Sequence, residues 1–379
     1  MLIHNDIQLD FDDVLIAPQT TTINHRGEVD IEREFKYIGL KCIPIMSANM
    51  TQTGTIELAE KLIDYGMCAT LHKFYTADDI IVFLNVQKQL HNDLPLPKYQ
   101  NVFKRIFITV GKRNWKQELE KLDKVKKSCE VDFSILLDVP NAYIPEITDC
   151  VKQLRELYPN QIIAVGNVCS GDETQKLILA GATYVKCGIG PSKICDTRIK
   201  TGCGRPQLSA IIECANAAHQ VGGHIIADGG FKMNGDFCKA FVAGADMCMT
   251  GSMFAGCEES SGFVIKKYYA TGEYSYEEYY NSMDEKTEYA PFKPLGEMKF
   301  YKEYYGMSSF RAQKENYGKT TTTGTSEGVE CKLIPYTGPI IDTLNDIAGS
   351  LRSCGSYIGA KNIKNFSRQG MFYKVNRIK

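Results

Sequence analysis

Short apolar or β-branched runs recur along the chain, and segments with helical spacing separate them. Eight such runs occur, at 43–48, 67–71, 106–110, 133–138, 162–165, 183–187, 224–228 and 246–250. Helices are expected at 55–65, 117–128, 143–158, 174–180, 208–220, 237–243 and 340–347. Strands that alternate with helices indicate parallel βαβ units, and strands that are apolar throughout indicate burial on both faces. The pattern therefore predicts an α/β fold, a (β/α)8 TIM barrel. A doubly wound sheet is the alternative, but no Gly-x-Gly-x-x-Gly sequence follows the first run.

Polar residues and glycines follow the ends of the last two runs. In a TIM barrel the functional residues lie just after the strands, and the loops after strands seven and eight often bind phosphate. Asp228-Gly229-Gly230 and Gly251-Ser252 occupy those places. Each pair alone could be a plain turn. Together they predict a site for a nucleotide monophosphate, with glycine N–H groups on the phosphate and Asp228 on the ribose hydroxyls.

Composition and charge exclude several classes of protein. The 379 residues are 44% hydrophobic and 23% charged, with a formal net charge of −1, which is typical of a globular protein. Such a charge gives no reason to expect nucleic acid or an anionic membrane as a partner. No apolar run reaches the roughly 18 residues that span a bilayer, and the first residues do not resemble a secretory signal. The 14 scattered cysteines form no Cys-x-x-Cys pair, so we expect reduced thiols in the cytoplasm and no zinc site.

A loop after the sixth run carries the strongest candidate chemistry. Gly188-Ile189-Gly190-Pro191 is followed by Cys195, with Thr197 two residues on and Arg198 next to it. A free cysteine is only about 3% thiolate at pH 7, and a nearby cation lowers the pKa of a thiol. Most cysteines are small buried hydrophobes, so residue type alone leaves both interpretations open. The surrounding loop favours a nucleophilic cysteine.

This loop closely resembles the active-site loop of the IMP dehydrogenase and GMP reductase family. The resemblance rests on residues 188–191, Cys195-Asp196-Thr197-Arg198, Lys200-Thr201-Gly202 and Pro206-Gln207, in order and at fixed spacing. It extends from Asp10 to about Phe366, and Thr-Arg-x-x-Thr-Gly looks more like the reductase branch. For this chain the resemblance implies NADPH-dependent conversion of GMP to IMP with release of ammonia, through a covalent cysteine thioimidate.

The resemblance also implies a set of site residues. The catalytic residues are expected to be Cys195, Thr197 and Glu327. The substrate site would comprise Asp228, Gly229, Gly230, Gly251, Ser252, Gly306, Met307, Ser308, Ser326 and Gly328. The cofactor site would comprise His25, Arg26, Lys73, Asp138, Val139, Pro140, Ile189 and Gly190, with Ser353, Cys354, Gly355 and Ser356 reaching the dinucleotide of a neighbouring subunit from a C-terminal loop. A potassium ion would lie at Gly190, Ser192, Cys195 and Arg198, and the assembly would be a homotetramer.

Two further functions stay open at this point. One is the dehydrogenase branch, which oxidises IMP to XMP with NAD, although no regulatory domain separates residues 71 and 106. The other is an inert nucleotide-binding scaffold, for which a Tyr/Glu-rich insertion at 257–300 is the best argument. We expect one domain over 1–379, with this insertion after strand eight as a helical hairpin or interface element. Residues 319–328, rich in Thr and Gly, are expected to form a mobile flap.

Overall fold

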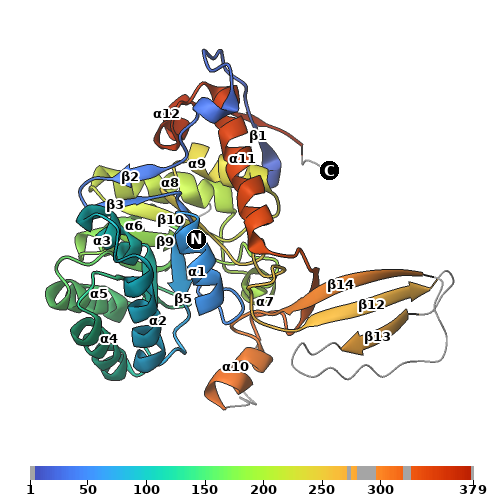
Figure 1. The fold of residues 1–379 in the computed structure, drawn as a ribbon. Helices are drawn as coiled ribbons and strands as arrows, with labels where there is room; N and C mark the ends of the chain where they lie inside the picture. The colour runs from blue at the N-terminus through green and yellow to red at the C-terminus, as the bar shows by residue number, and fades with distance from the viewer. Residues whose placement is uncertain (1–4, 271–274, 280–295, 319–325, 377–379) are drawn as a thin grey trace.

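Eight parallel strands form the centre of the computed structural model, which describes residues 5–270, 275–279, 296–318 and 326–376 (Figure 1). The strands are β4 (Ile45–Ser47), β5 (Ala69–Leu71), β6 (Ile106–Val110), β7 (Ser134–Asp138), β8 (Ile163–Val168), β9 (Tyr184–Cys187), β10 (His224–Asp228) and β11 (Met247–Thr250). They are hydrogen-bonded in the order β4-β11-β10-β9-β8-β7-β6-β5. A parallel bridge between Met46 and Cys68 brings β4 beside β5 and closes the ring. The predicted (β/α)8 barrel and its eight strands are confirmed.

Successive side chains of a strand point to opposite sides, and both sides are buried here, one against the outer helices and one inside the barrel. In β6, Ile106, Ile108 and Val110 pack toward the outer helices, whereas Phe107 belongs to the cluster inside the barrel. Leu136 of β7 lies inside in the same way. This period of two explains why the runs are apolar throughout, and it fixes which residue of each strand faces the interior.

Helices surround the strands and follow them in the chain. They are α1 (Ile56–Asp64), α2 (Ala77–Leu90), α3 (Leu96–Lys104), α4 (Trp115–Cys129), α5 (Pro145–Leu157), α6 (Gly171–Leu179), α8 (Gln207–Gln220), α9 (Asn234–Val242) and α11 (Ile340–Ile358). All seven predicted helices are present, and α2 and α3 were not predicted. No helix in the described ranges combines the length and apolar character needed to cross a bilayer.

Small elements cover the N-terminal end of the barrel and join the chain's ends. The hairpin of β2 (Arg33–Phe35) and β3 (Leu40–Cys42) contributes Phe35, Leu40 and Cys42 to the interior cluster. β1 (Val14–Ile16) pairs antiparallel with β16 (Phe372–Lys374). Short helices complete the fold: η1 (Phe11–Asp13), η2 (Arg26–Glu28), α7 (Thr197–Thr201), α10 (Phe310–Tyr317), η3 (Ile363–Asn365) and α12 (Phe366–Gln369).

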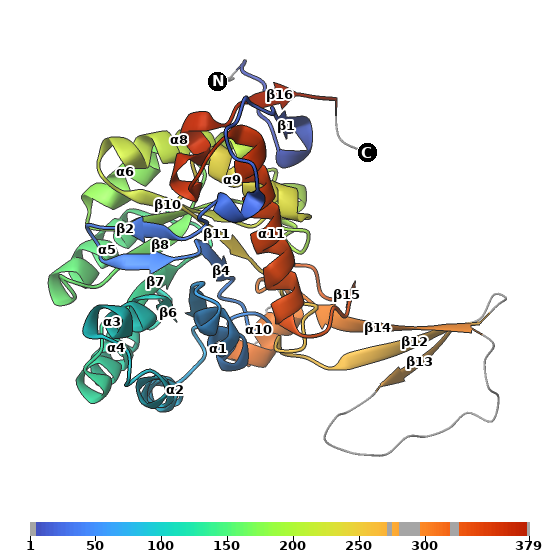
Figure 2. The same ribbon diagram turned by 45° about the horizontal axis from the view of Figure 1, so that its top comes forward.

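The insertion at 257–300 forms antiparallel sheet in its described part, so the prediction of a helical hairpin is wrong there. β12 (Val264–Ala270), β13 (Ser275–Tyr279), β14 (Gly296–Tyr304) and β15 (Lys332–Pro335) pair in the order β13-β12-β14-β15 and project from the barrel as an arm (Figures 1 and 2). Tyrosine and β-branched residues favour strands, and this preference outweighs the helical spacing of the tyrosines. Buried Lys302 anchors the arm, because its Nζ donates to the carbonyls of Cys257 (2.8 Å) and Ser260 (2.6 Å).

The C-terminal segment at 353–356, predicted as a loop, is instead part of helix α11. The helix continues past residue 347 because Leu351 and Ile358 extend the buried apolar stripe begun by Leu344 and Ile347. It ends at Gly359, whose φ of +72° is the left-handed conformation common after a helix. Ser353, Cys354, Gly355 and Ser356 therefore lie on a rigid helix.

Candidate active site

A cleft of about 550 Å³ opens at the C-terminal ends of the barrel strands. Most of the predicted site residues line it: Lys73, Asp138, Val139, Pro140, Gly190, Ser192, Cys195, Asp228, Gly229, Gly251, Gly306, Met307, Ser308, Glu327 and Gly328. Their positions span more than 250 residues of sequence, so it is the parallel barrel that brings them to one end. The structure thus assembles residues from all three predicted groups around Cys195.

A chain of hydrogen bonds connects the thiol to a carboxylate. Cys195 Sγ lies 3.2 Å from Thr197 Oγ1, and this hydroxyl donates to Glu327 Oε2 at 2.9 Å. All three residues are half-buried. The hydroxyl stands between the sulfur and the acid, so it can carry a proton between them.

The backbone holds the acid beside the thiol loop. Glu327 accepts the Asp196 N–H through its carbonyl at 2.7 Å, and Gly328 forms an antiparallel bridge with Cys195. Gly306 packs so closely that a Cβ there would lie 2.6 Å from the Gly328 Cα atom and from the Ile194 carbonyl. The end of the predicted flap is therefore docked on the loop, whereas its residues 319–325, with Gly324, lie outside the described residues.

A layer of charged side chains forms the floor of the cleft. Lys186 is 2% exposed, and its Nζ lies 2.9 Å from Asp138 Oδ1 and 3.0 Å from Asp228 Oδ2. Asn167 Nδ2 also donates to Asp228 Oδ2, at 2.8 Å. Sequence reasoning missed Lys186 as a site residue. The signal was present, because a lysine inside a buried strand is rare unless it is paired.

The charges of the floor stabilise one another. Burial alone would lower the pKa of Lys186, but Asp138 and Asp228 outweigh it and raise that pKa above its ordinary value. Burial would raise the pKa of Asp138, but Lys186 and then Lys73 hold it below its usual range. Lys186 is therefore an ammonium and Asp138 a carboxylate at neutral pH, and the two form an ion pair at the floor of the cleft.

Cations and aromatic rings surround one side of the cleft. Lys73 Nζ lies 5.7 Å from the centre of the Phe74 ring, and Arg113 stands 5.1 Å from the Tyr317 ring. The rings of Phe74 and Tyr317 meet edge to face at 5.5 Å. Sequence reasoning missed Arg113 and Tyr317, because nothing in the local pattern places α10 beside the loop after β6.

Several predicted site residues do not line this cleft. His25 and Arg26, at η2, and residues 353–356 of α11 are absent from its walls, although η2 packs against α11. Four more predicted residues stand behind the lining: Thr197, Gly230, Ile189 and Ser326. The Ile189 carbonyl accepts the Arg198 Nε–H at 3.1 Å, and the Ser326 hydroxyl donates to the Gly328 carbonyl at 2.8 Å. Arg26 and the α11 residues could meet a ligand only outside the cleft of their own chain.

Ser252 lines a second cavity, of about 610 Å³, on the other side of the thiol loop. The two cavities share Ile194 and Tyr304 as a wall. Burial raises the pKa of Tyr304 far above its ordinary value, so the phenol stays protonated. The larger cavity lacks Cys195 and Glu327, and we therefore place the chemistry in the smaller one.

The residues predicted to hold a cation form the turn around Cys195. The Ser192 carbonyl accepts the Cys195 N–H at 3.1 Å, and the Arg198 carbonyl accepts the Gly202 N–H at 3.2 Å. The Arg198 side chain runs across Gly190, where a Cβ would lie 2.5 Å from its Cγ. The structure orders this turn, and its occupation by potassium stays a prediction.

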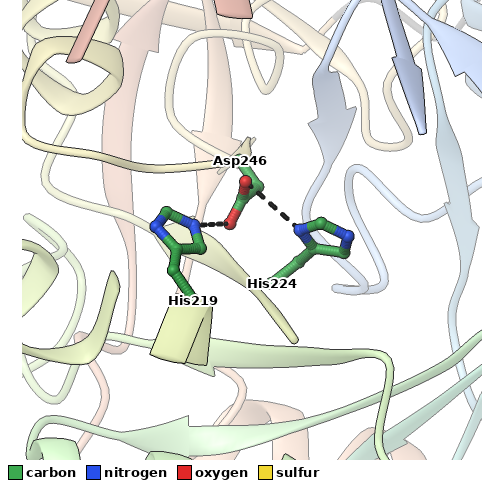
Figure 3. A group of neighbouring side chains, drawn as sticks. All are labelled: His219, His224 and Asp246. Carbon is green, nitrogen blue, oxygen red and sulfur yellow. Dashed lines mark hydrogen bonds and ion pairs between the residues drawn. The ribbon is translucent and has the colours of Figure 1, made fainter. Parts of the chain in front are cut away.

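A separate cluster of titratable groups lies at the N-terminal end of the barrel (Figure 3). His219 Nε2 lies 2.8 Å from Asp246 Oδ2, and His224 Nδ1 lies 3.3 Å from Asp246 Oδ1. These are the only three His, Cys, Asp or Glu side chains in the described ranges that are grouped closely enough to hold a metal. However, the Arg33 guanidinium is ion-paired with the same carboxylate. A cation already fills the position that a metal would need, so we interpret the cluster as structural.

Comparison with known proteins identifies the family. The family model described as the IMP dehydrogenase / GMP reductase domain matches residues 8–290 and 282–378. GMP reductase of Klebsiella pneumoniae subsp. pneumoniae is 37% identical over 380 aligned positions, which cover 99% of this chain and 97% of the relative. GMP reductases of Photobacterium profundum and Phytophthora infestans are 36% and 35% identical, over 99% of this chain and 97% and 92% of their own lengths. The chain therefore belongs to the IMP dehydrogenase / GMP reductase family, and it is an oxidoreductase.

Proposed function

We propose that the chain catalyses the reductive deamination of GMP to IMP, with NADPH as the reductant and ammonia as the second product. The observation that carries this proposal is the hydrogen-bonded series Cys195–Thr197–Glu327, at 3.2 and 2.9 Å, in a cleft with two chemically different sides. GMP is the substrate named by the relatives, each of which is a GMP reductase.

The first half of the reaction needs a nucleophile and a proton carrier. Cys195 Sγ bonds to C2 of the guanine ring, and the C2–N2 bond breaks. The thiol proton passes through Thr197 to Glu327 and returns to the departing nitrogen, which leaves as ammonia. A covalent thioimidate remains on Cys195, and it divides a difficult displacement into two easier steps.

In the second half the thioimidate is reduced and released. NADPH, when bound, supplies the hydride that C2 receives. The C2–Sγ bond then breaks, IMP leaves, and the sulfur of Cys195 takes up a proton. The docked segment 326–328 covers the thiol loop, and exclusion of water there prevents hydrolysis of the thioimidate to XMP.

The two sides of the cleft fit the two ligands. One side of the cleft offers hydrogen-bonding groups for ribose and phosphate, from Asp228, Gly229, Gly251 and residues 306–308. Gly230 and Ser252 adjoin this side. The other side of the cleft is lined by charged and aromatic side chains: Lys73, Arg113, Asp138, Phe74 and Tyr317. They offer the cations and aromatic faces that a phosphorylated dinucleotide needs. Val139, Pro140 and Gly190 complete this side, and Ile189 stands behind it. His25, Arg26 and Ser353–Ser356 lie elsewhere, and we assign them to a dinucleotide bound in a neighbouring subunit.

A homotetramer, a cytoplasmic location and a potassium ion bound at Gly190, Ser192, Cys195 and Arg198 belong to the same proposal. The cation would stabilise the turn that carries the thiol. Replacement of potassium by lithium at constant ionic strength is expected to lower GMP turnover. Equal rates in the two salts would remove the ion from the proposal.

A spectrophotometric comparison tests the reaction. The protein is mixed with GMP and NADPH, and separately with IMP and NAD, while nicotinamide absorbance is followed. We expect GMP-dependent loss of NADPH with ammonia formed, and no NADH from IMP. Growth of NADH with XMP as product would assign the chain to the dehydrogenase branch. No change in nicotinamide absorbance in either mixture, with nucleotide binding intact, would favour an inert scaffold.

A further inference from the structure

Lys186 connects the two sides of the cleft from below. It lies on β9, two residues after Tyr184, which belongs to the cluster inside the barrel. By the period of two, Lys186 also points inward, and so do Asp138 after Leu136 and Asp228 after Ile226. These three side chains form the uppermost layer of the barrel interior.

The layer is built to hold the ammonium in one place. Lys186 Nζ contacts Asp138 Oδ1 at 2.9 Å, Asp228 Oδ2 at 3.0 Å and Asn49 Oδ1 at 3.4 Å, and the Met249 sulfur lies 3.9 Å away. The neighbouring strand β8 carries a glycine beside it, Gly166, where a Cβ would lie only 2.4 Å from the Lys186 Cβ. The side chain therefore has a fixed position against its neighbours.

One cation serves two carboxylates in this layer. Both oxygens lie within 3.0 Å of the same nitrogen, so they are at most twice that distance apart. Like charges that close repel strongly unless a cation stands between them. Lys73 is the other cation near Asp138; both lysines line the cleft, but Lys73 is half-buried, whereas Lys186 is 2% exposed.

We propose that Lys186 is a positioning residue that sets the Asp138 and Asp228 carboxylates for the two ligands together. The inference rests on the proposed function, in which Asp228 belongs to the nucleotide side and Asp138 to the cofactor side. Lys186 itself contacts neither ligand in this assignment. It acts through the two aspartates, and so it links the GMP site to the NADPH site.

This role predicts a distinctive pattern of affinities. Lys186→Met weakens both GMP and NADPH binding by about tenfold or more, because both carboxylates lose their partner. Asp228→Asn weakens GMP binding alone, and Asp138→Asn weakens NADPH binding alone. Titration calorimetry with each ligand separately measures these affinities, without any need for turnover.

A pH profile separates positioning from mere support of the fold. Without the ammonium, the repulsion between Asp138 and Asp228 raises the pKa of one of them, and that group keeps a proton near neutral pH. GMP or NADPH affinity of Lys186→Met should therefore improve as the pH rises from 6 to about 8.5. In the unmodified chain the raised pKa of Lys186 and the lowered pKa of Asp138 leave these groups charged through that window.

Lys239→Met is the matched control. Lys239 is also buried, and its Nζ donates to the Phe11 carbonyl at 2.8 Å and pairs with Asp236 at 3.6 Å, on α9 and outside the cleft. We expect this variant to lose thermal stability and to keep both affinities. Should Lys186→Met fail to fold, Lys186→Gln, which keeps a donor but no charge, carries the same two tests.

The outcomes separate the inference from the proposed function. If a folded Lys186 variant binds either ligand within about twofold of the unmodified chain, or shows no new pH dependence, the inference is wrong. If the unmodified chain binds neither GMP nor NADPH, the proposed function is wrong.

Discussion

Glu327→Gln tests the proton-carrying role of the acid most directly. The substitution keeps the length of the side chain and the backbone contacts of the segment, in which the Glu327 carbonyl accepts the Asp196 N–H and Gly328 bridges to Cys195. The amide can still accept the Thr197 hydroxyl, but it cannot take up a proton. The change therefore removes one chemical property and little structure.

The expected magnitude follows from that property. General acid–base catalysis by a positioned side chain typically contributes about 10²–10⁴-fold. We expect GMP turnover to fall by about that factor, with ammonia release slowed more than hydride transfer. Because Glu327 is only half-buried and a neutral acceptor remains, the free energy of unfolding should change by about 1 kcal/mol or less.

The assay follows ammonia release and NADPH oxidation in a single turnover, and Glu330→Gln is the control. Glu330 lies three residues further along the same segment, where its carboxylate accepts the N–H groups of Phe310 (2.8 Å) and Arg311 (3.0 Å) and the Ser326 hydroxyl (2.8 Å). It has no contact with the thiol chain among the described residues, so its variant should keep the turnover rate. A loss below about threefold for Glu327→Gln would mean that this acid is only a loop residue.

Three further predictions test other parts of the site and the fold. Cys195→Ser should abolish turnover but leave GMP affinity largely unchanged by calorimetry, since other loops hold the phosphate; retained turnover would remove Cys195 from the mechanism. Guanosine should be a very poor substrate in kcat as well as affinity, because binding energy from the remote phosphate helps to hold the ring at the thiol; turnover equal to that of GMP contradicts the assignment of the loops at Asp228 and Gly251. His72 is stacked on Tyr75 with ring centres 4.1 Å apart, and burial lowers the pKa of its imidazole to about 4. As the pH drops, the imidazole is therefore protonated in the unfolded chain before it is protonated in the folded chain. The free energy of unfolding should fall by up to about 3 kcal/mol between about pH 6.5 and pH 4. His72→Phe keeps the stacking and should reduce the slope of melting temperature against pH in that window; an unchanged slope would show that His72 is not buried in its neutral form.

The barrel could be predicted from the sequence because each strand carries its own signal. Runs such as 106–110 and 224–228 match β6 and β10 residue for residue, since apolar strands buried on both faces leave little ambiguity. The arm could not be predicted in this way. Its tyrosines fit both helical spacing and a strand, and pairing with β14 decides between the two.

The parts of the candidate site that are contiguous in the sequence could be predicted, whereas the parts brought together by packing could not. Cys195, Thr197 and the loops after β10 and β11 are read from contiguous motifs, and the structure brings them to one cleft with Glu327. Arg113 and Tyr317 come together only because α10 packs beside the loop after β6. Residues 353–356 were expected in a loop because the stretch resembles the C-terminal loop of the family, yet the stripe through Leu351 and Ile358 keeps them helical.

The two ends of the barrel interior show how similar residues come to serve different purposes. At the N-terminal end the Asp246 carboxylate is fully buried, and groups of the chain contact both oxygens. Arg33 is ion-paired with Oδ1, and the His224 ring lies 3.3 Å from the same oxygen; His219 and the Ile225 N–H lie 2.8 Å from Oδ2. Those contacts, Arg33 and then the two histidines, hold the pKa of Asp246 far below its usual range against the effect of burial.

At the C-terminal end the carboxylates are partnered from one side. Lys186 and Asn167 both reach Asp228 through Oδ2, and the residue lines the cleft. A carboxylate has about four lone-pair sites, so Asp228 retains accepting capacity toward the cleft, whereas both oxygens of Asp246 are buried against groups of the chain. The same pairing of an acid with a cation therefore satisfies the carboxylate within the fold at one end of the barrel, and at the other leaves a carboxylate facing the cleft in which we propose that the ligands bind.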